Sequence, residues 1–130
     1  MPEIPSHLKY TAEHEWISFE DDGTALIGIT DFAQSELGDI VYVELPEVAE
    51  TLTQAETFGS IEAVKTVADL FAPLSGEVIE VNPELQDAPT LINESPYDDG
   101  WIVRVRPSEP SEFERLLSAD QYTDQVGEAD

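Results

Sequence analysis

The chain has 130 residues, and 41% of them are hydrophobic, which is enough for one domain with its own core. It carries 29 acidic residues against 5 basic ones, a formal net charge of −24, with 12, 10 and 7 of the acids in residues 1–50, 51–100 and 101–130. The acidity is therefore spread over the chain. It disfavours binding to nucleic acid or anionic membranes and favours basic partner surfaces. We interpret most of it as an aid to solubility or an adaptation to a salty cytoplasm.

The absence of cysteine excludes disulfides, thiolate metal sites and a cysteine nucleophile. No apolar run approaches the roughly 20 residues of a membrane span. The first residues resemble neither a signal peptide nor an Arg-rich transit peptide. We therefore expect a cytoplasmic protein without a membrane anchor.

The first third of the chain predicts a β-hairpin followed by a short helix. Residues 1–9 contain two prolines and are expected to be extended and partly mobile. Strands are predicted at 14–19 and 24–29, with an Asp-Asp-Gly turn between them. The helix is expected to begin at Asp31 as its N-cap and to end at Gly38.

The middle of the chain predicts a tight hairpin with a lysine at its tip. Residues 57–63 and 66–71 are rich in Phe, Ile, Val and Thr, and only Val64 and Lys65 separate them. Lys65 is one of two lysines, the other being Lys9. A lone lysine displayed in this way indicates covalent attachment of a swinging arm. The competing interpretation is an ordinary exposed lysine.

Further short strands are predicted on both sides of this hairpin. They are expected at 39–45, within 47–55, and at 77–81 and 101–105, whereas residues 82–100 are expected to form a loop. Many short strands with little helix predict a mainly β protein, either a sandwich or a flattened barrel.

The C-terminal segment, residues 111–127, predicts two short helices. Ser111 and Ser118 are the candidate N-caps. The first of these helices is expected to bury the side chains of Phe113, Leu116 and Leu117.

A polar cluster, Glu13, His14 and Glu15, precedes Trp16. With only His7 as a second histidine, the chain has too few ligands for a typical zinc site, so solvated acids at a strand edge are the favoured interpretation. His14 is expected to be a hydrogen-bonding structural residue. Paired carboxylates could act in acid–base catalysis, but 29 acids form pairs by chance. No Ser-His-Asp spacing, phosphate loop or dinucleotide fingerprint occurs.

Four segments in register resemble the glycine cleavage system H proteins. They are YTAEHEW (Tyr10–Trp16), IGITDFAQSELGDIVYVELP (Ile27–Pro46), GSIEAVKTVADLFAPLSGEVIEVN around Lys65, and LINESPYDDGWIVRV (Leu91–Val105). The resemblance covers nearly the whole chain. It implies a single lipoyl-carrier domain over residues 1–130, folded as a hybrid barrel-sandwich of the lipoyl/biotinyl type, with lipoic acid on Lys65. Biotin is not expected, because acceptors of biotin carry Met on both sides of the lysine.

The resemblance also implies a non-enzymatic carrier function. Lipoyl-Lys65 would take the aminomethyl group of glycine from a pyridoxal-phosphate-dependent decarboxylase (P protein) to a tetrahydrofolate-dependent aminomethyltransferase (T protein). Dihydrolipoyl dehydrogenase (L protein) would reoxidise the arm. A lipoate ligase or lipoyltransferase would attach it, and the carrier itself is expected to be a monomer.

Particular residues match the family pattern. Glu62 and Gly76 fit the context that the attaching enzyme recognises, and Glu15 and Asp69 match the carboxylates that hold the cationic amine of the loaded arm. Other positions depart from the pattern. Ala63 and Ala68 replace serines, and two alanines, at 49 and 55, replace glycines. If these two alanines need positive φ, they cost roughly 1 kcal/mol each.

Two other functions stay open at this point. The chain could be a lipoyl relay that donates lipoate to other complexes. It could also be an unmodified acidic interaction module in which Lys65 is a relic.

Overall fold

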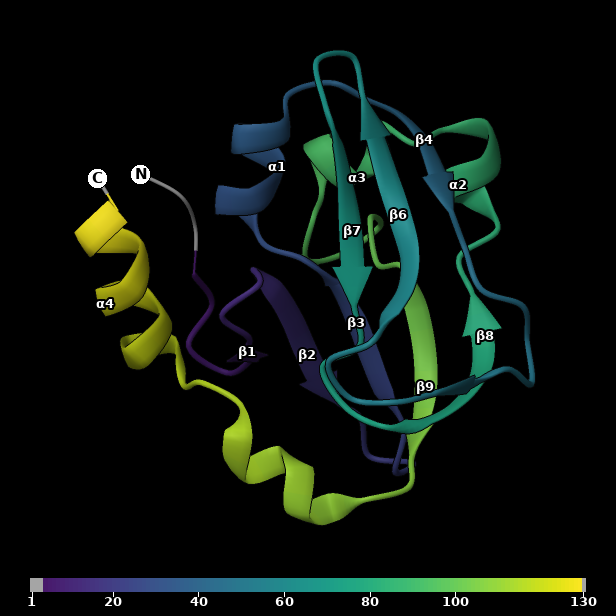
Figure 1. The fold of residues 1–130 in the computed structure, drawn as a ribbon, viewed down its shortest axis with the longest axis vertical. Helices are drawn as coiled ribbons and strands as arrows, with labels where there is room; N and C mark the ends of the chain where they lie inside the picture. Colours follow the sequence, from purple (N-terminus) through teal and green to yellow (C-terminus); the bar gives the residue numbers. More distant parts are fainter. Residues whose placement is uncertain (1–3, 130) are drawn as a thin grey trace.

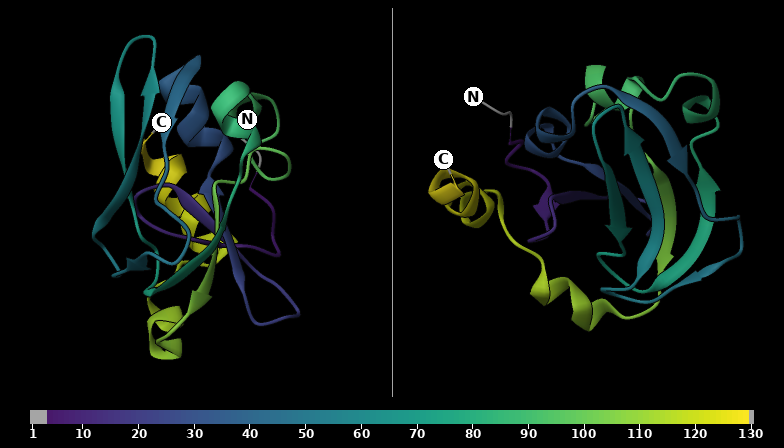
Figure 2. Two further views of the ribbon diagram at one scale, coloured as in Figure 1. Left: turned by 90° about the vertical axis from the view of Figure 1, so that its right-hand side faces the viewer. Right: turned by 45° about the horizontal axis from the view of Figure 1, so that its top comes forward.

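A computed structural model describes residues 4–129 as two antiparallel sheets that curve around a shared core, with short helices at their edges (Figures 1 and 2). The larger sheet comprises, in order, β1 (Lys9–Tyr10), β2 (Glu15–Phe19), β3 (Ala25–Ile29), β9 (Val103–Pro107), β8 (Gly76–Val81) and β5 (Thr51–Leu52). The smaller sheet comprises β4 (Ile40–Glu44), β6 (Thr57–Ala63) and β7 (Val67–Phe71). The prediction of a mainly β sandwich is confirmed. Residues 1–9 were expected to be extended and partly mobile, and the first three of them lie outside the described residues.

The two predicted hairpins are present. β2 pairs with β3 in the register Ile17 opposite Ile27, and β6 pairs with β7 in the register Ile61 opposite Ala68. Alternation of side chains along the strands directs every second residue inward, which explains the periodic apolar pattern.

The main core fills the space between the two sheets. It consists of fully enclosed aliphatic side chains from both sheets and from the loop between β7 and β8, including Ile17, Ile27, Val43, Ile61, Leu74, Val78 and Val105. A second cluster lies on the other face of β2, where Tyr10 and Trp16 pack against Tyr122 and Val126 of the C-terminal helix. Burial of each such side chain stabilises the fold by about 1.5–3 kcal/mol.

The first helix, α1 (Asp31–Leu37), begins one residue later than predicted. Its N-cap is Thr30, whose hydroxyl accepts a hydrogen bond of 3.2 Å from the amide of Ala33, and Asp31 is the first helical residue. The prediction of Asp31 as N-cap was wrong. Thr and Asp are both favourable N-cap residues, and the sequence alone does not show at which of the two the helical backbone begins. The predicted stop is confirmed, since Gly38 ends the helix with φ 79°.

The segment 82–100 contains two four-residue helices, α2 (Glu84–Asp87) and α3 (Leu91–Glu94), instead of the predicted loop alone. Each lasts a single turn and buries one apolar side chain, Leu85 and Ile92 respectively. One turn is too short to produce a helical period in the sequence.

The C-terminal segment forms a 3₁₀ helix, η1 (Pro110–Arg115), and then α4 (Ala119–Ala129). Ser111 is not an N-cap, because η1 starts at Pro110 after Glu109. Ser118 is confirmed as the cap of α4: its hydroxyl accepts from the amide of Gln121, and the Gln121 side chain accepts from the Ser118 amide. Leu116 is buried as predicted, while Phe113 and Leu117 are half-buried.

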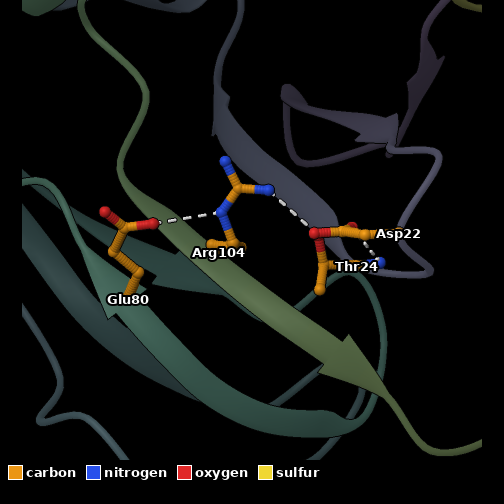
Figure 3. Close-up of polar contacts among 4 residues, drawn as sticks. All are labelled: Asp22, Thr24, Glu80 and Arg104. Atoms are coloured by element: carbon orange, nitrogen blue, oxygen red, sulfur yellow. Dashed lines mark hydrogen bonds and ion pairs between the residues drawn. The ribbon is translucent and has the colours of Figure 1, made fainter.

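Arg104 of β9 connects β8 to the turn between β2 and β3 (Figure 3). Its guanidinium donates to Glu80 of β8 at 3.1 Å and to the hydroxyl of Thr24, beside β3, at 3.0 Å. Thr24 in turn donates twice to Asp22, and these hydrogen bonds lower the pKa of Asp22. The cluster fastens the β2/β3 turn to the sheet.

The two alanines that stand in place of glycine do adopt positive φ. Ala49 has φ 79° and Ala55 has φ 73°. Both lie in the loops around β5, and both are exposed. The suspected local strain is therefore present.

No helix within residues 4–129 is long and apolar enough to cross a membrane.

Candidate functional site

Lys65 lies at the tip of the β6/β7 hairpin, which projects at the top of Figure 1. Val64 and Lys65 form a two-residue turn, closed by a hydrogen bond of 2.8 Å from the amide of Ala63 to the carbonyl of Thr66. Both tip side chains are exposed, that of Val64 to 76%. Within residues 4–129, no carboxylate forms an ion pair with the Lys65 amine. The amine is thus open to an acylating enzyme, as attachment of lipoate requires.

A cleft of about 260 Å³ lies beside the hairpin, between α1 and the start of β2 on one side and β7 on the other. Its apolar lining comes from Ile29, Phe32, Leu37, Ile61 and Leu70. Glu15 and Asp69, distant in sequence, both line it. An apolar cleft with carboxylates at its edge fits a hydrocarbon arm that ends in a cationic amine.

Glu15 is buried, with 2% of its surface exposed. Its carboxyl accepts hydrogen bonds from the Thr11 hydroxyl at 2.8 Å and from the backbone amide of Phe71 in β7 at 3.1 Å. Burial raises the pKa of Glu15 to about 8, although both hydrogen bonds act in the opposite direction. The interpretation of this cluster as solvated acids was therefore wrong for Glu15, because the edge of β7 covers it. Glu13 is exposed as expected.

Asp69 and Glu62 are exposed residues of the hairpin itself. Asp69 of β7 pairs with Ser60 of β6. It comes two residues before Phe71, whose backbone amide donates to the Glu15 carboxyl. Glu62 lies opposite Val67 and borders the same surface hollow as Lys65. Glu62 and Lys65 thus lie on the same surface near the hairpin tip.

Gly76 is the first residue of β8, in the larger sheet, whereas the hairpin belongs to the smaller sheet. A Cβ on Gly76 would overlap the backbone carbonyl of Arg106 in the neighbouring strand. This close approach of two backbones is sufficient reason for glycine. A role of Gly76 in recognition by the attaching enzyme stays a prediction.

His14 belongs to a buried network that connects the body to α4. Its Nδ1 lies 2.8 Å from the hydroxyl of Tyr122, which also lies 2.7 Å from the hydroxyl of Thr30. The His14 ring packs on Phe32, a residue of the cleft, at 5.0 Å between centroids. Burial lowers the pKa of His14. The expectation of a hydrogen-bonding structural histidine is met.

Sequence reasoning missed this network because no local pattern signals it. Tyr122 is 108 residues from His14 and 92 from Thr30.

Over the described part of the chain, no three His, Asp or Glu side chains are arranged to hold a metal ion.

A larger, open hollow of about 800 Å³ lies on the outer face of the smaller sheet. Carboxylates dominate its polar lining, with Glu44, Glu47, Glu50 and Asp69 among them. Lys65 does not line it. Its shape and charge suit transient contact with a basic protein surface.

Comparison with known proteins agrees with this arrangement. The pattern of the glycine cleavage H-protein family matches residues 8–129. The glycine cleavage system H proteins of Staphylococcus epidermidis and Staphylococcus haemolyticus are 54% and 55% identical over 125 residues, which is 96% of this chain and 98% of each relative.

The fold agrees as well. The crystal structure of a glycine cleavage system H protein from Mycobacterium marinum matches with a TM-score of 0.86 and 43% identity, over 95% of this chain and 99% of that one. The two facing sheets are thus the barrel-sandwich of the lipoyl type. The chain belongs to the glycine cleavage H-protein family.

Proposed function

We propose that this chain is the lipoyl carrier of a glycine cleavage system, with lipoate attached to Lys65. The observation that carries the proposal is the isolated, exposed amine of Lys65 at the tip of a protruding hairpin, beside an apolar cleft. The chain acts as a carrier subunit and not as a catalyst, which agrees with the names of its relatives.

In this function the carrier meets several partners in turn. A ligase or lipoyltransferase loads lipoate on Lys65. The P protein then delivers the aminomethyl group of glycine, the T protein passes it to tetrahydrofolate with release of ammonia, and the L protein restores the oxidised carrier. The dithiolane of lipoate supplies the redox chemistry when bound. Because all partners must reach the same tip, their contacts with the monomeric carrier are transient and partly electrostatic.

The cleft gives the chain a second task, which is to protect the loaded arm. Its apolar lining excludes water, and Glu15 and Asp69 offer carboxylates to a cationic amine. With a pKa of about 8, Glu15 is mostly protonated at pH 7. A cation beside it favours the ionised form, so docking of the amine is accompanied by release of the Glu15 proton.

The proposed function is tested by glycine–bicarbonate exchange with purified P protein and the lipoylated chain. Lys65→Arg should support no exchange, and Lys9→Arg should match the unchanged chain. Exchange by Lys65→Arg would refute the proposal. A chain that takes up lipoate but supports no exchange would instead favour the lipoyl relay.

A further inference from the structure

Asn93 of α3 makes a three-point contact beneath the hairpin tip. Its side-chain amide donates to the carbonyl of Gly38 at 2.8 Å and to the side-chain oxygen of Gln34 at 3.0 Å. Its side-chain oxygen accepts from the amide of Ile40 at 3.0 Å. Only this orientation of the Asn93 amide works, since a carbonyl must accept and a backbone N–H must donate.

These contacts fix the three residues that support the tip. Between the two backbone positions that Asn93 holds, the carbonyl of Asp39 accepts a hydrogen bond of 3.1 Å from the amide of Val64. Gly38 lies against the stem of Lys65, because a Cβ on Gly38 would be 3.5 Å from the lysine Cε. We call residues 38–40 the tip support.

The tip support needs an external brace. It runs from Gly38, the C-cap of α1 with φ 79°, to Ile40, the first residue of β4. Asn93 comes from a separate element, α3, which packs against α1 behind the hairpin (Figure 1). The Gln34 side chain that Asn93 contacts is itself held by Asp31 at 2.7 Å. Asn93 thus joins α1, α3 and the tip support.

We propose that Asn93 is the positioning residue for Lys65: through the tip support, it sets the conformation in which the hairpin tip is presented to the enzyme that attaches lipoate. This inference rests on the proposed function, since it assumes that Lys65 is acylated. Without Asn93, the tip samples several conformations, and the attaching enzyme binds only the competent fraction. The apparent KM for the chain rises by the inverse of that fraction, while kcat changes little.

The test compares Asn93→Ala with Asn82→Ala in lipoylation by a purified lipoate ligase. Asn82 is a matched control: its amide donates to the carbonyls of Asp99 at 2.9 Å and Trp101 at 2.8 Å, and its oxygen accepts from the amide of Glu84 at 3.1 Å. It is buried and, like Asn93, makes two donor bonds and one acceptor bond with its side chain, but none of them reaches the tip support.

Kinetics are measured at a temperature where both variants are folded. Asn93→Ala should raise KM about tenfold with kcat within about twofold of the original, and Asn82→Ala should leave both within about twofold. Equal KM values for the two variants would overturn the inference.

Amide hydrogen exchange gives a second readout that needs no acylation. In Asn93→Ala, the Val64 amide should exchange about tenfold faster, because its acceptor on Asp39 is no longer held in place. The Ala63 amide, bonded within the hairpin to Thr66, should keep its rate. Unchanged Val64 exchange would refute the positioning role. If the unaltered chain takes up no lipoate, the proposed function fails, and exchange at Val64 still tests the brace.

Discussion

Glu15 is a carboxylic acid enclosed between the start of β2 and the edge of β7. Its two hydrogen-bond donors, Thr11 and the Phe71 amide, favour the ionised form, yet desolvation dominates and holds its pKa at about 8. The unfolded chain releases this proton near the ordinary value of 4.5, whereas the folded chain keeps it up to about 8. The contribution of Glu15 to stability is therefore complete below pH 4.5 and is lost as the pH rises to 8.

Replacement of this carboxyl should remove that pH dependence. Between pH 5 and 8, the free energy of unfolding of Glu15→Gln should fall less than that of the unaltered chain, by on the order of 3 kcal/mol. Urea titrations at several pH values measure the difference.

Glu114→Gln is the control, since this exposed residue of η1 does not act on Glu15 and the variant should retain the slope. Parallel pH profiles for Glu15→Gln and the unaltered chain would show that Glu15 ionises normally.

Ala49 and Ala55 carry backbone strain that glycine would relieve. Both have φ above 70°, a region that costs an L-residue about 1 kcal/mol. Ala49→Gly and Ala55→Gly should each raise the free energy of unfolding by about 0.5–1 kcal/mol, as measured by urea unfolding.

Ala88→Gly is the matched control for these substitutions. Ala88 has φ −138°, so glycine relieves no strain there and only adds freedom to the unfolded chain. It should be neutral or destabilising. Stabilisation equal to that of Ala55→Gly would contradict the assignment of strain.

At the scale of elements, α4 is attached to the body through the buried side chains of Tyr122 and Val126. The Tyr122 ring stacks on Tyr10 at 4.8 Å between centroids, and its hydroxyl contacts His14 and Thr30. Figure 2 shows α4 lying beside the sheets at the edge of the molecule. Because Thr30 caps α1, this one hydroxyl links α4 to the helix that borders the cleft.

Tyr122→Phe keeps the stacked ring and removes only this hydroxyl. It should lower the free energy of unfolding by about 2 kcal/mol, because the buried Thr30 and the half-buried His14 each lose a hydrogen bond. Tyr42→Phe, at a half-exposed position of β4, should change it by less than about 0.5 kcal/mol. Equal effects in thermal unfolding would show that the network contributes nothing.

The predictability of each element follows its length and its local signals. Alternating strands, the two-residue turn at Lys65 and the cap at Ser118 leave local patterns, and the turn and the cap were predicted correctly. The last strand was predicted two residues early, at 101–105, where the structure has β9 (Val103–Pro107), and the two-residue β1 was not predicted as a strand. One-turn helices such as α2 leave none. The burial of Glu15 and the bracing by Asn93 depend on segments distant in sequence, so no spacing in the chain could predict them.

At the scale of the whole molecule, acidity dominates. The net charge is −24, and two ion pairs are present among residues 4–129, Arg104 with Glu80 and Arg106 with Glu77. Most carboxylates therefore repel one another across the surface, which lowers the stability of the compact state.

Salt should relieve this repulsion. The Debye length falls from about 10 Å at 0.1 M to about 3 Å at 1 M, so the midpoint of thermal unfolding should rise by roughly 5 °C or more between dilute buffer and 1 M KCl. Near pH 4.1, where the net charge approaches zero, the same addition should have little effect. An equal rise at both pH values would exclude charge repulsion as the cause.

The central claim, that Lys65 carries lipoate, is tested most directly by intact mass and peptide mapping of the protein from its native cell. We expect a lipoyl-sized addition on the peptide that contains Lys65 and none on the peptide that contains Lys9. An unmodified chain, isolated from cells that lipoylate other proteins, would contradict the claim and favour an acidic interaction module.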